Sequence, residues 1–171
     1  MIYTLLEPEH EMLKHSLPEI TAETEPESRK ELLDNMVETM KHYGGIGLSA
    51  NQVGLPIRMF VFGDKEHYVP CFNPRIIETA GELIPIEEGC LTYPGLFIKI
   101  FRPESVTMTF EDENRELHEE TFTGLMARVF LHEMDHMDGI DFTSRAGKMA
   151  LDIAKRKRLR GVRKLKKMQE R

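Results

Sequence analysis

The chain has 171 residues, of which 40% are hydrophobic and 30% charged, and its formal net charge is −6. This length suits one domain with a sizeable core, and the composition argues against disorder and against a membrane span, because no apolar run approaches about 18 residues. The charge is uneven, since residues 155–171 hold ten Lys or Arg and one acid, a net +9, which leaves −15 for the rest. A basic tail on an acidic body suits an anionic partner for the tail alone.

The N-terminal stretch MIYTLLEPEHEML contains an acidic residue at position 7 and lacks both a basic segment and a long apolar run. It does not resemble a secretory or transit peptide, so we expect a cytoplasmic protein without membrane association. Two cysteines, Cys71 and Cys90, are too few for a disulfide framework and leave one internal bridge or two free thiols.

The first helix is predicted over about residues 26–43. Thr24 and Glu27 have the spacing of a capping box, and Pro26 is tolerated in a first turn. Gly44 and Gly45 are expected to end the helix. Its apolar positions recur at helical intervals: Leu32, Leu33, Met36, Val37 and Met40.

Short strands are expected through the middle of the chain. Residues 58–62 are apolar and partly β-branched, and alternating apolar residues over 106–110 precede a polar turn at 112–115, with a hairpin return over about 117–122. Five prolines, at positions 70, 74, 85, 94 and 103, exclude long helices here and favour short strands and loops.

Two further helices are predicted. Thr123 is expected to cap the first of them, whose apolar face leads to His132, and Gly139 marks its end. The last helix is expected to begin near Ser144 and to carry Leu151, Leu159, Val162 and Leu165 among many cations. The fold class is therefore α+β, with short mixed or antiparallel strands around a central helix that carries an HExxH motif, and with a C-terminal helix.

The segment HEMDH, residues 132–136, carries the chemistry. Residues four apart share one face of a helix, so His132 and His136 can bind one metal ion together. Glu133 points beside them and can take a proton from a water molecule on that ion. The alternative is a chance match on a charged helix with both histidines exposed, because a pattern with three fixed positions is only moderately specific.

A catalytic metal of this type needs a third protein ligand and an open position. The long metalloprotease signature would place that ligand at Phe142, which cannot bind metal, and the sole glutamate after His136 is Glu170 in the basic tail. Three aspartates remain with nothing to recommend them: Asp138, Asp141 and Asp152.

Cys90 lies in the segment GCLTYPG. A lone cysteine is by default a small buried hydrophobe, and we interpret Cys71 in that way. For Cys90 the context changes this interpretation, because GIGLSANQ (45–52), EGCLT (88–92) and HEMDH follow one another in the chain. In order, spacing and content they resemble the three signature motifs of the peptide deformylases. The resemblance covers most of the chain, from the first helix to about residue 145.

The resemblance implies metal-dependent hydrolysis of the N-formyl group from formyl-methionine at the N-terminus of nascent polypeptides, with release of formate. It implies a catalytic domain over residues 1–146, followed by a basic helical tail over residues 147–171. Cys90, His132 and His136 would bind one divalent ion. Fe²⁺ is expected in the cell, with Zn²⁺, Ni²⁺ or Co²⁺ as substitutes, although sulfur plus imidazole suits zinc and iron alike.

The resemblance also implies the remaining catalytic roles. Glu133 would be the general base, and the tetrahedral oxyanion would receive hydrogen bonds from the Gln52 side-chain amide and the backbone N–H of Leu91. Without the motif, Gln52 would be interpreted as a surface polar residue in a loop. Glu88 and Arg102 would form an ion pair that braces the cysteine loop.

A substrate-binding segment and pocket are implied as well. Gly45, Ile46 and Gly47 would pair with the extended substrate backbone, although a glycine pair is more often a simple turn. Leu125 and Val129 share a helix face with His132 and would line the pocket for the first substrate residue, although periodicity alone favours core positions for them.

Three residues depart from the family pattern. Thr92 replaces a usual serine and Ser49 a common alanine, and both changes are small. Arg128 is a larger departure, because it lies one turn before His132 on a face where related enzymes tend to be apolar. It could alter the substrate pocket, or its side chain could extend to solvent.

The basic tail has several interpretations. It could be a solvated helical face, a nucleic-acid contact or an anchor to a larger anionic body, and in related bacterial enzymes a C-terminal helix docks on the ribosome near the exit tunnel. We therefore expect ribosome contact here. The alternatives for the whole chain are an HExxH zinc metallopeptidase, which would tolerate loss of Cys90, and a catalytically inactive binding module stabilised by a metal.

Overall fold

The structure is a computed structural model that describes residues 1–64 and 66–169, with side chains as far as Arg163 in the last helix. Residues 170 and 171 of the predicted tail, and the side chain of Leu165, lie outside the described part. In chain order the elements are a short 3-10 helix η1 (Glu11–Lys14), α1 (Arg29–His42), β1 (Gly47–Ser49), η2 (Ala50–Val53), β2 (Met59–Gly63), β3 (Tyr68–Gly89), β4 (Phe97–Glu111), β5 (Leu117–Thr123), α2 (Gly124–Met137), η3 (Phe142–Arg145) and α3 (Lys148–Gln169). The α+β fold class is confirmed.

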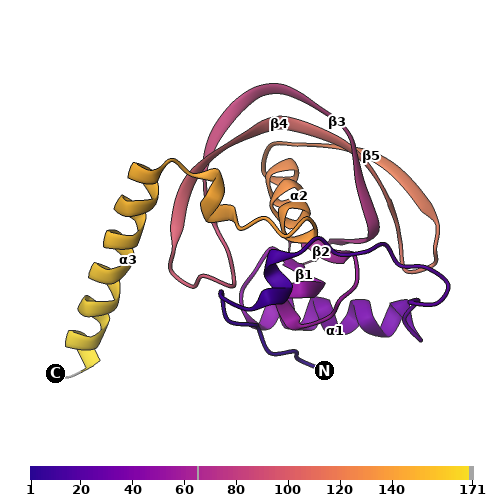
Figure 1. Ribbon diagram of the computed structural model, residues 1–171, viewed down its shortest axis with the longest axis horizontal. Coiled ribbons are helices and arrows are strands. Elements are labelled where there is room, and N and C mark those ends of the chain that lie inside the picture. Colours follow the sequence, from indigo (N-terminus) through magenta and orange to yellow (C-terminus); the bar gives the residue numbers. More distant parts are fainter. Residues whose placement is uncertain (65, 170–171) are drawn as a thin grey trace.

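The five strands form one sheet in the order β1-β2-β3-β4-β5, and every neighbouring pair is antiparallel. The first residues of β3 pair with β2, and the rest of β3 pairs with β4. Figure 1 shows that β3 and β4 bend into an arch over α2, while β1 and β2 lie on the other side of this helix and α1 lies beyond them. The central helix is therefore enclosed by the sheet.

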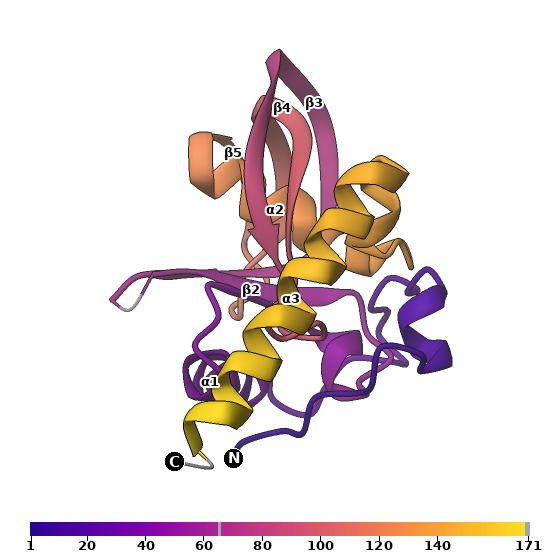
Figure 2. The same ribbon diagram turned by 90° about the vertical axis from the view of Figure 1, so that its left-hand side faces the viewer.

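The expectation of only short strands was wrong, because β3 has 22 residues and β4 has 15. Prolines are tolerated in these strands because the ladder is interrupted: the register shifts between Phe72 and Arg75, around Pro74, and twice more before Leu83. These irregularities also bend the strand pair, which Figure 2 shows rising steeply from the level of β2.

Helix α1 begins at Arg29 and not at residue 26. Ser28 is its N-cap, and the Ser28 side chain accepts a hydrogen bond from the backbone N–H of Glu31. The predicted cap, Thr24, instead accepts a hydrogen bond from the backbone N–H of Thr21 in a preceding turn. Two residues with similar capping chemistry compete for this role, and sequence spacing alone chose the wrong one. The helix ends before Gly44, which has a φ of 71°.

Helix α2 begins after Thr123 as predicted, although the Thr123 side chain makes no capping hydrogen bond. Phe130 is fully buried between Phe60 and Phe62 of β2, with ring centroids 5.2 and 5.9 Å away. Gly139 follows the helix with a φ of 69°. Packing against β2 on this face turns the other face of α2 towards the segment that holds Cys90.

Helix α3 begins at Lys148, later than the predicted start near Ser144. Residues 142–145 form the separate short helix η3, whose first turn is capped by the side chain of Asp141. Ala150, Leu151 and Ala154 of α3 pack against the cluster that contains Cys90. The rest of α3 projects from the body (Figure 1). None of the helices in the described part of the chain is both long enough and apolar enough to span a membrane.

Candidate active site

Three buried side chains converge at the middle of the molecule. His132 and His136 lie one turn apart on α2, and Cys90 lies directly after the end of β3. One ligand atom from each of the three residues lies within 4.8 Å of the other two, and Cys90 Sγ is 3.3 Å from His136 Nε2. One sulfur and two imidazole nitrogens at this separation fit a single divalent ion of the zinc or iron type. The three residues predicted as ligands are therefore brought together.

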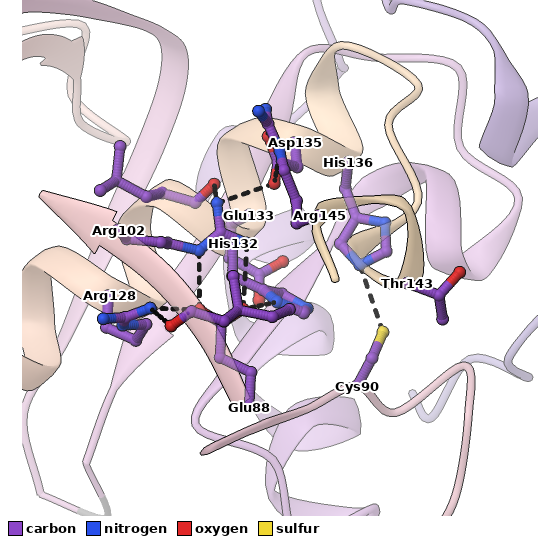
Figure 3. A network of polar contacts seen from close by, with 12 residues as sticks. Glu88, Cys90, Arg102, Arg128, His132, Glu133, Asp135, His136, Thr143 and Arg145 are labelled. Atoms are coloured by element: carbon purple, nitrogen blue, oxygen red, sulfur yellow. Dashed lines mark hydrogen bonds and ion pairs between the residues drawn. The ribbon is translucent and has the colours of Figure 1, made fainter. Parts of the chain in front are cut away.

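The ring orientation of His132 is fixed by a carboxylate on the side of the ring opposite to Cys90. Its Nδ1 lies 3.1 Å from Glu88 Oε2, so the imidazole can donate to this carboxylate and direct Nε2 towards Cys90. Figure 3 shows Glu88 beside His132, with Arg102 and Arg128 both directed towards the same carboxylate. The predicted ion pair is present, with Arg102 Nε 2.7 Å and Arg102 Nη2 3.0 Å from the two Glu88 oxygens. It is buried and not exposed.

The charges in this cluster alter its protonation. Burial would raise the pKa of the Cys90 thiol, but the charges and hydrogen bonds of His136 and His132 lower it to about 5. Burial opposes a charged His132, but Cys90 and Glu88 together raise its pKa to about 10. Cysteine is therefore held as the thiolate, which is the form that binds metal.

Glu133 directly follows His132 on α2, but its side chain contacts a different part of the molecule, the end of β1. Its side chain is buried and accepts a hydrogen bond from the hydroxyl of Ser49, at the end of β1. Burial raises the pKa of the Glu133 carboxyl, against the lowering effect of the neighbouring histidines. A raised pKa brings a carboxylate closer to the range in which it can both accept and return a proton near neutral pH.

Gln52 lies in η2 and is buried, not a surface residue in a loop. Its Oε1 accepts a hydrogen bond from the Ser49 backbone N–H at 2.9 Å, which orients the amide so that Nε2 points towards the cysteine. Nε2 donates to Thr92 Oγ1 at 3.0 Å and lies 3.5 Å from Cys90 Sγ. The retained hydroxyl of Thr92 thus helps to hold the amide in place.

A cavity of about 810 Å³ opens beside this cluster. Its lining includes all the residues predicted to contact substrate: Gly45, Ile46, Gly47, Leu125 and Val129. Leu125 is 57% exposed, whereas Val129 is buried. Leu91 lies against Gly45, since an added Cβ there would come within 2.7 Å of Leu91 Cδ1.

The metalloprotease candidates for a third ligand have other partners. Asp138 pairs with Arg58 Nη2 at 3.0 Å, and Asp141 accepts a hydrogen bond from the hydroxyl of Tyr93. Phe142 packs against His132, with ring centroids 5.4 Å apart. No aspartate from this part of the chain joins the cluster of Cys90 and the two histidines within the described residues.

The structure corrects one interpretation and adds residues that the sequence did not reveal. The Arg128 side chain does not extend to solvent: it is buried, lines the cavity and donates to Glu88 Oε1 at 2.9 Å. Asp135 accepts from Arg102 Nη1 at 2.8 Å and from Arg145 Nη2 at 2.5 Å. The only sequence signal for Asp135 was its place inside the HEMDH segment.

A buried set of one cysteine and two histidines, with a glutamate beside it and an apolar cavity in front, defines a metal-dependent hydrolase of the HExxH type. Comparison with known proteins narrows this class. The sequence profile of the polypeptide deformylase family matches residues 2–151. The chain belongs to this family.

Individual relatives agree. A peptide deformylase from Christiangramia forsetii is 40% identical over 145 residues, which cover 75% of this chain and 74% of the relative. The crystal structure of the Thermotoga maritima peptide deformylase is similar, with a TM-score of 0.81, 34% identity and coverage of 86% of this chain and 99% of that one. The Synechococcus elongatus peptide deformylase in complex with actinonin gives a TM-score of 0.82 at 32% identity, with coverage of 91% and 85%.

The protein is therefore a metal-dependent hydrolase that removes the N-formyl group from methionine at the start of nascent polypeptides.

Proposed function

We propose that Cys90, His132 and His136 hold the divalent ion of this enzyme. The observation that carries the proposal is the convergence of their ligand atoms within 4.8 Å, in a buried place beside Glu133. An ion held by these three residues would act as a Lewis acid and lower the pKa of water towards neutrality.

The general base in this proposal is Glu133. Its carboxylate lies between Ser49 and the cavity, where it can accept the proton of the attacking water and pass it to the departing amine of methionine. Two donors stabilise the oxyanion that forms at the formyl carbon: the Gln52 amide, which is oriented by Ser49, and the backbone N–H of Leu91.

Substrate binding follows the same cavity. The segment of Gly45, Ile46 and Gly47 enters β1 at the edge of the sheet, so an extended peptide can add to it as a further strand. This mode reads main chain and accepts many sequences. Leu125 and Val129 provide the apolar wall for the methionine side chain.

The metal site is tested with Cys90→Ala. We expect the variant to lose the bound ion and formate release together. A zinc endopeptidase that used the HExxH motif alone would keep its metal in this variant and would cleave internal peptide bonds.

Glu133→Ala tests the general base. If the ion were merely structural, the substitution would affect only the stability of the protein. If Glu133 is the general base, we expect the variant to retain the metal and to lose activity. Metal content after anaerobic purification tests our expectation of Fe²⁺, with Zn²⁺, Ni²⁺ or Co²⁺ as substitutes.

We further propose that the chain consists of a catalytic domain over residues 1–146 and a basic tail over residues 147–171, and that it acts in the cytoplasm. The tail is proposed to contact the ribosome. The support is the charge of residues 155–171, with ten cations against one acid, together with the way helix α3 projects from the body (Figure 1). Deletion of residues 155–171 is expected to weaken ribosome binding and to reduce its salt dependence. Unchanged affinity and unchanged salt dependence would contradict this part of the proposal.

A further inference from the structure

The guanidinium of Arg128 makes three hydrogen bonds that the proposed catalytic mechanism does not require. It donates from Nη1 to Glu88 Oε1 at 2.9 Å and to the backbone carbonyl of Ile100 at 2.7 Å. From Nη2 it donates to the backbone carbonyl of Ile84. The side chain is only 4% exposed. A single side chain of α2 therefore bridges Glu88 and both strands of the arch, since Ile84 lies in β3 and Ile100 in β4.

The Glu88 carboxylate is held by two arginines in different ways. Arg102 reaches both Glu88 oxygens and also donates to Asp135 Oδ2, so it belongs to a second ion pair that reaches Arg145. Arg128 contacts only Oε1, and its remaining contacts are to backbone carbonyls. Both arginines pair with the carboxylate, and both reach backbone groups. Arg102 donates to the Leu131 carbonyl of α2 at 3.3 Å, whereas Arg128 connects the carboxylate to carbonyls in both strands of the arch.

That position matters because the other Glu88 oxygen, Oε2, is the one that faces His132 Nδ1, at 3.1 Å. A carboxylate that is free to rotate would release Nδ1, and the imidazole could then turn Nε2 away from Cys90. Carboxylates behind metal-binding histidines fix ring orientation in this way, and their loss typically weakens metal binding.

We propose that Arg128 is a positioning residue for the metal site: by tying Glu88 to the backbone of β3 and β4, it keeps His132 oriented towards Cys90. The inference rests on the proposed metal site. Arg128 also lines the cavity, but its three hydrogen bonds go to Glu88 and to backbone carbonyls, so in this proposal it acts through Glu88 on a metal ligand.

The experiment measures metal affinity, which a merely structural ion pair would not change. Metal-free wild type, Arg128→Met and Arg128→Lys are titrated with Co²⁺ against a chromogenic chelator, and the visible spectrum of the Co²⁺ form is recorded. We expect Arg128→Met to bind Co²⁺ about 10- to 100-fold more weakly, with an altered spectrum. Arg128→Lys keeps the charge but loses the forked geometry, so we expect an intermediate affinity.

Arg58 offers a matched control, because it is also a largely buried arginine that pairs with one carboxylate and donates to two backbone carbonyls. Its Nη2 pairs with Asp138, and its Nη1 donates to the carbonyls of Met137 and Leu17, away from Glu88. We expect Arg58→Met to lower thermal stability while Co²⁺ affinity stays within about twofold, since it leaves the groups behind His132 in place.

The inference is overturned if folded Arg128→Met binds Co²⁺ as wild type does, or if Arg58→Met weakens binding equally. If Arg128→Met does not fold, Arg128→Lys decides: affinity and spectrum equal to those of wild type would also overturn it. Cys90→Ser separates this inference from the site itself, because undiminished Co²⁺ affinity in that variant would show that the proposed metal site is wrong.

Discussion

Gly47 lacks a side chain at a place where none fits. A Cβ there would lie 2.9 Å from Val129 Cγ1 and would clash with the carboxylate of Glu133. Gly45 is also crowded, but its shortest contact is the flexible end of Leu91, which can move aside, and the nearest backbone atom, the carbonyl oxygen of Gly47, is 3.2 Å away. Gly47 is therefore required by the position of Glu133, the proposed general base, in addition to the proposed approach of a substrate backbone.

We predict that Gly47→Ala lowers kcat/KM for formate release about 100-fold, because displacement of a catalytic group by about 1 Å has an effect of this size. Gly45→Ala should have a smaller effect. Gly147→Ala is the control, since a Cβ there meets open space. Steady-state kinetics on a formyl-Met peptide provides the measurement, and a fully active Gly47→Ala would contradict the assigned position of Glu133.

Glu88 makes the stability of the metal-free protein depend on pH. Burial would raise the pKa of this carboxyl, but His132, Arg102 and Arg128 lower it from 4.5 to about 2. A lowered pKa in the folded state means that the stabilisation is complete above about pH 4.5 and is lost as the pH falls towards 2. At neutral pH it amounts to about 3 kcal/mol.

We predict that Glu88→Gln removes this contribution. Urea denaturation of the metal-free proteins should give a large difference in unfolding free energy at pH 6, because the unfolded carboxyl is then ionised. The difference should shrink steadily below about pH 4.5. A difference that stays constant down to pH 3 would mean that the pKa of Glu88 is not lowered in the folded protein.

At the scale of elements, α2 is held in place by aromatic packing. Phe130 is fully buried against Phe60 and Phe62, and this contact determines which face of α2 turns towards Cys90. We predict that Phe130→Ala lowers the unfolding free energy by about 3–5 kcal/mol. Phe101→Ala, at a position that is 62% exposed, should change it by no more than about 0.5 kcal/mol. Chemical denaturation measures both, and equal losses would contradict the packing described here.

Elements with a clear period were predictable from the sequence. The strand near residues 58–62, the hairpin that returns at 117–122 and the start of α2 after Thr123 are present as expected. The start of α1 and the length of β3 were not predictable, because Ser28 competes with Thr24 as a cap and bulges allow prolines in a long ladder. Such choices depend on partners far away in the sequence.

At the scale of the whole molecule, the candidate site too was only partly predictable from the sequence, because some of its contacts join residues far apart in the chain. The sequence indicated Cys90, His132 and His136, because three motifs occur in order and the fold then brings their ligand atoms together. It did not indicate that Arg128 turns inwards to Glu88, or that Asp135 joins Arg102 to Arg145. These contacts require β3, β4 and η3 to close around α2, and no local pattern records that arrangement.

The activity itself is tested most directly by formate release from a formyl-Met tripeptide, with protein prepared without oxygen and loaded with Fe²⁺, beside Glu133→Ala. We predict formate release by the wild type and a loss of about 10²- to 10⁴-fold in the variant, with the metal still bound. Absence of formate from folded, metal-loaded wild type would contradict the assigned reaction. Full activity of Glu133→Ala would contradict the proposal that Glu133 is the general base.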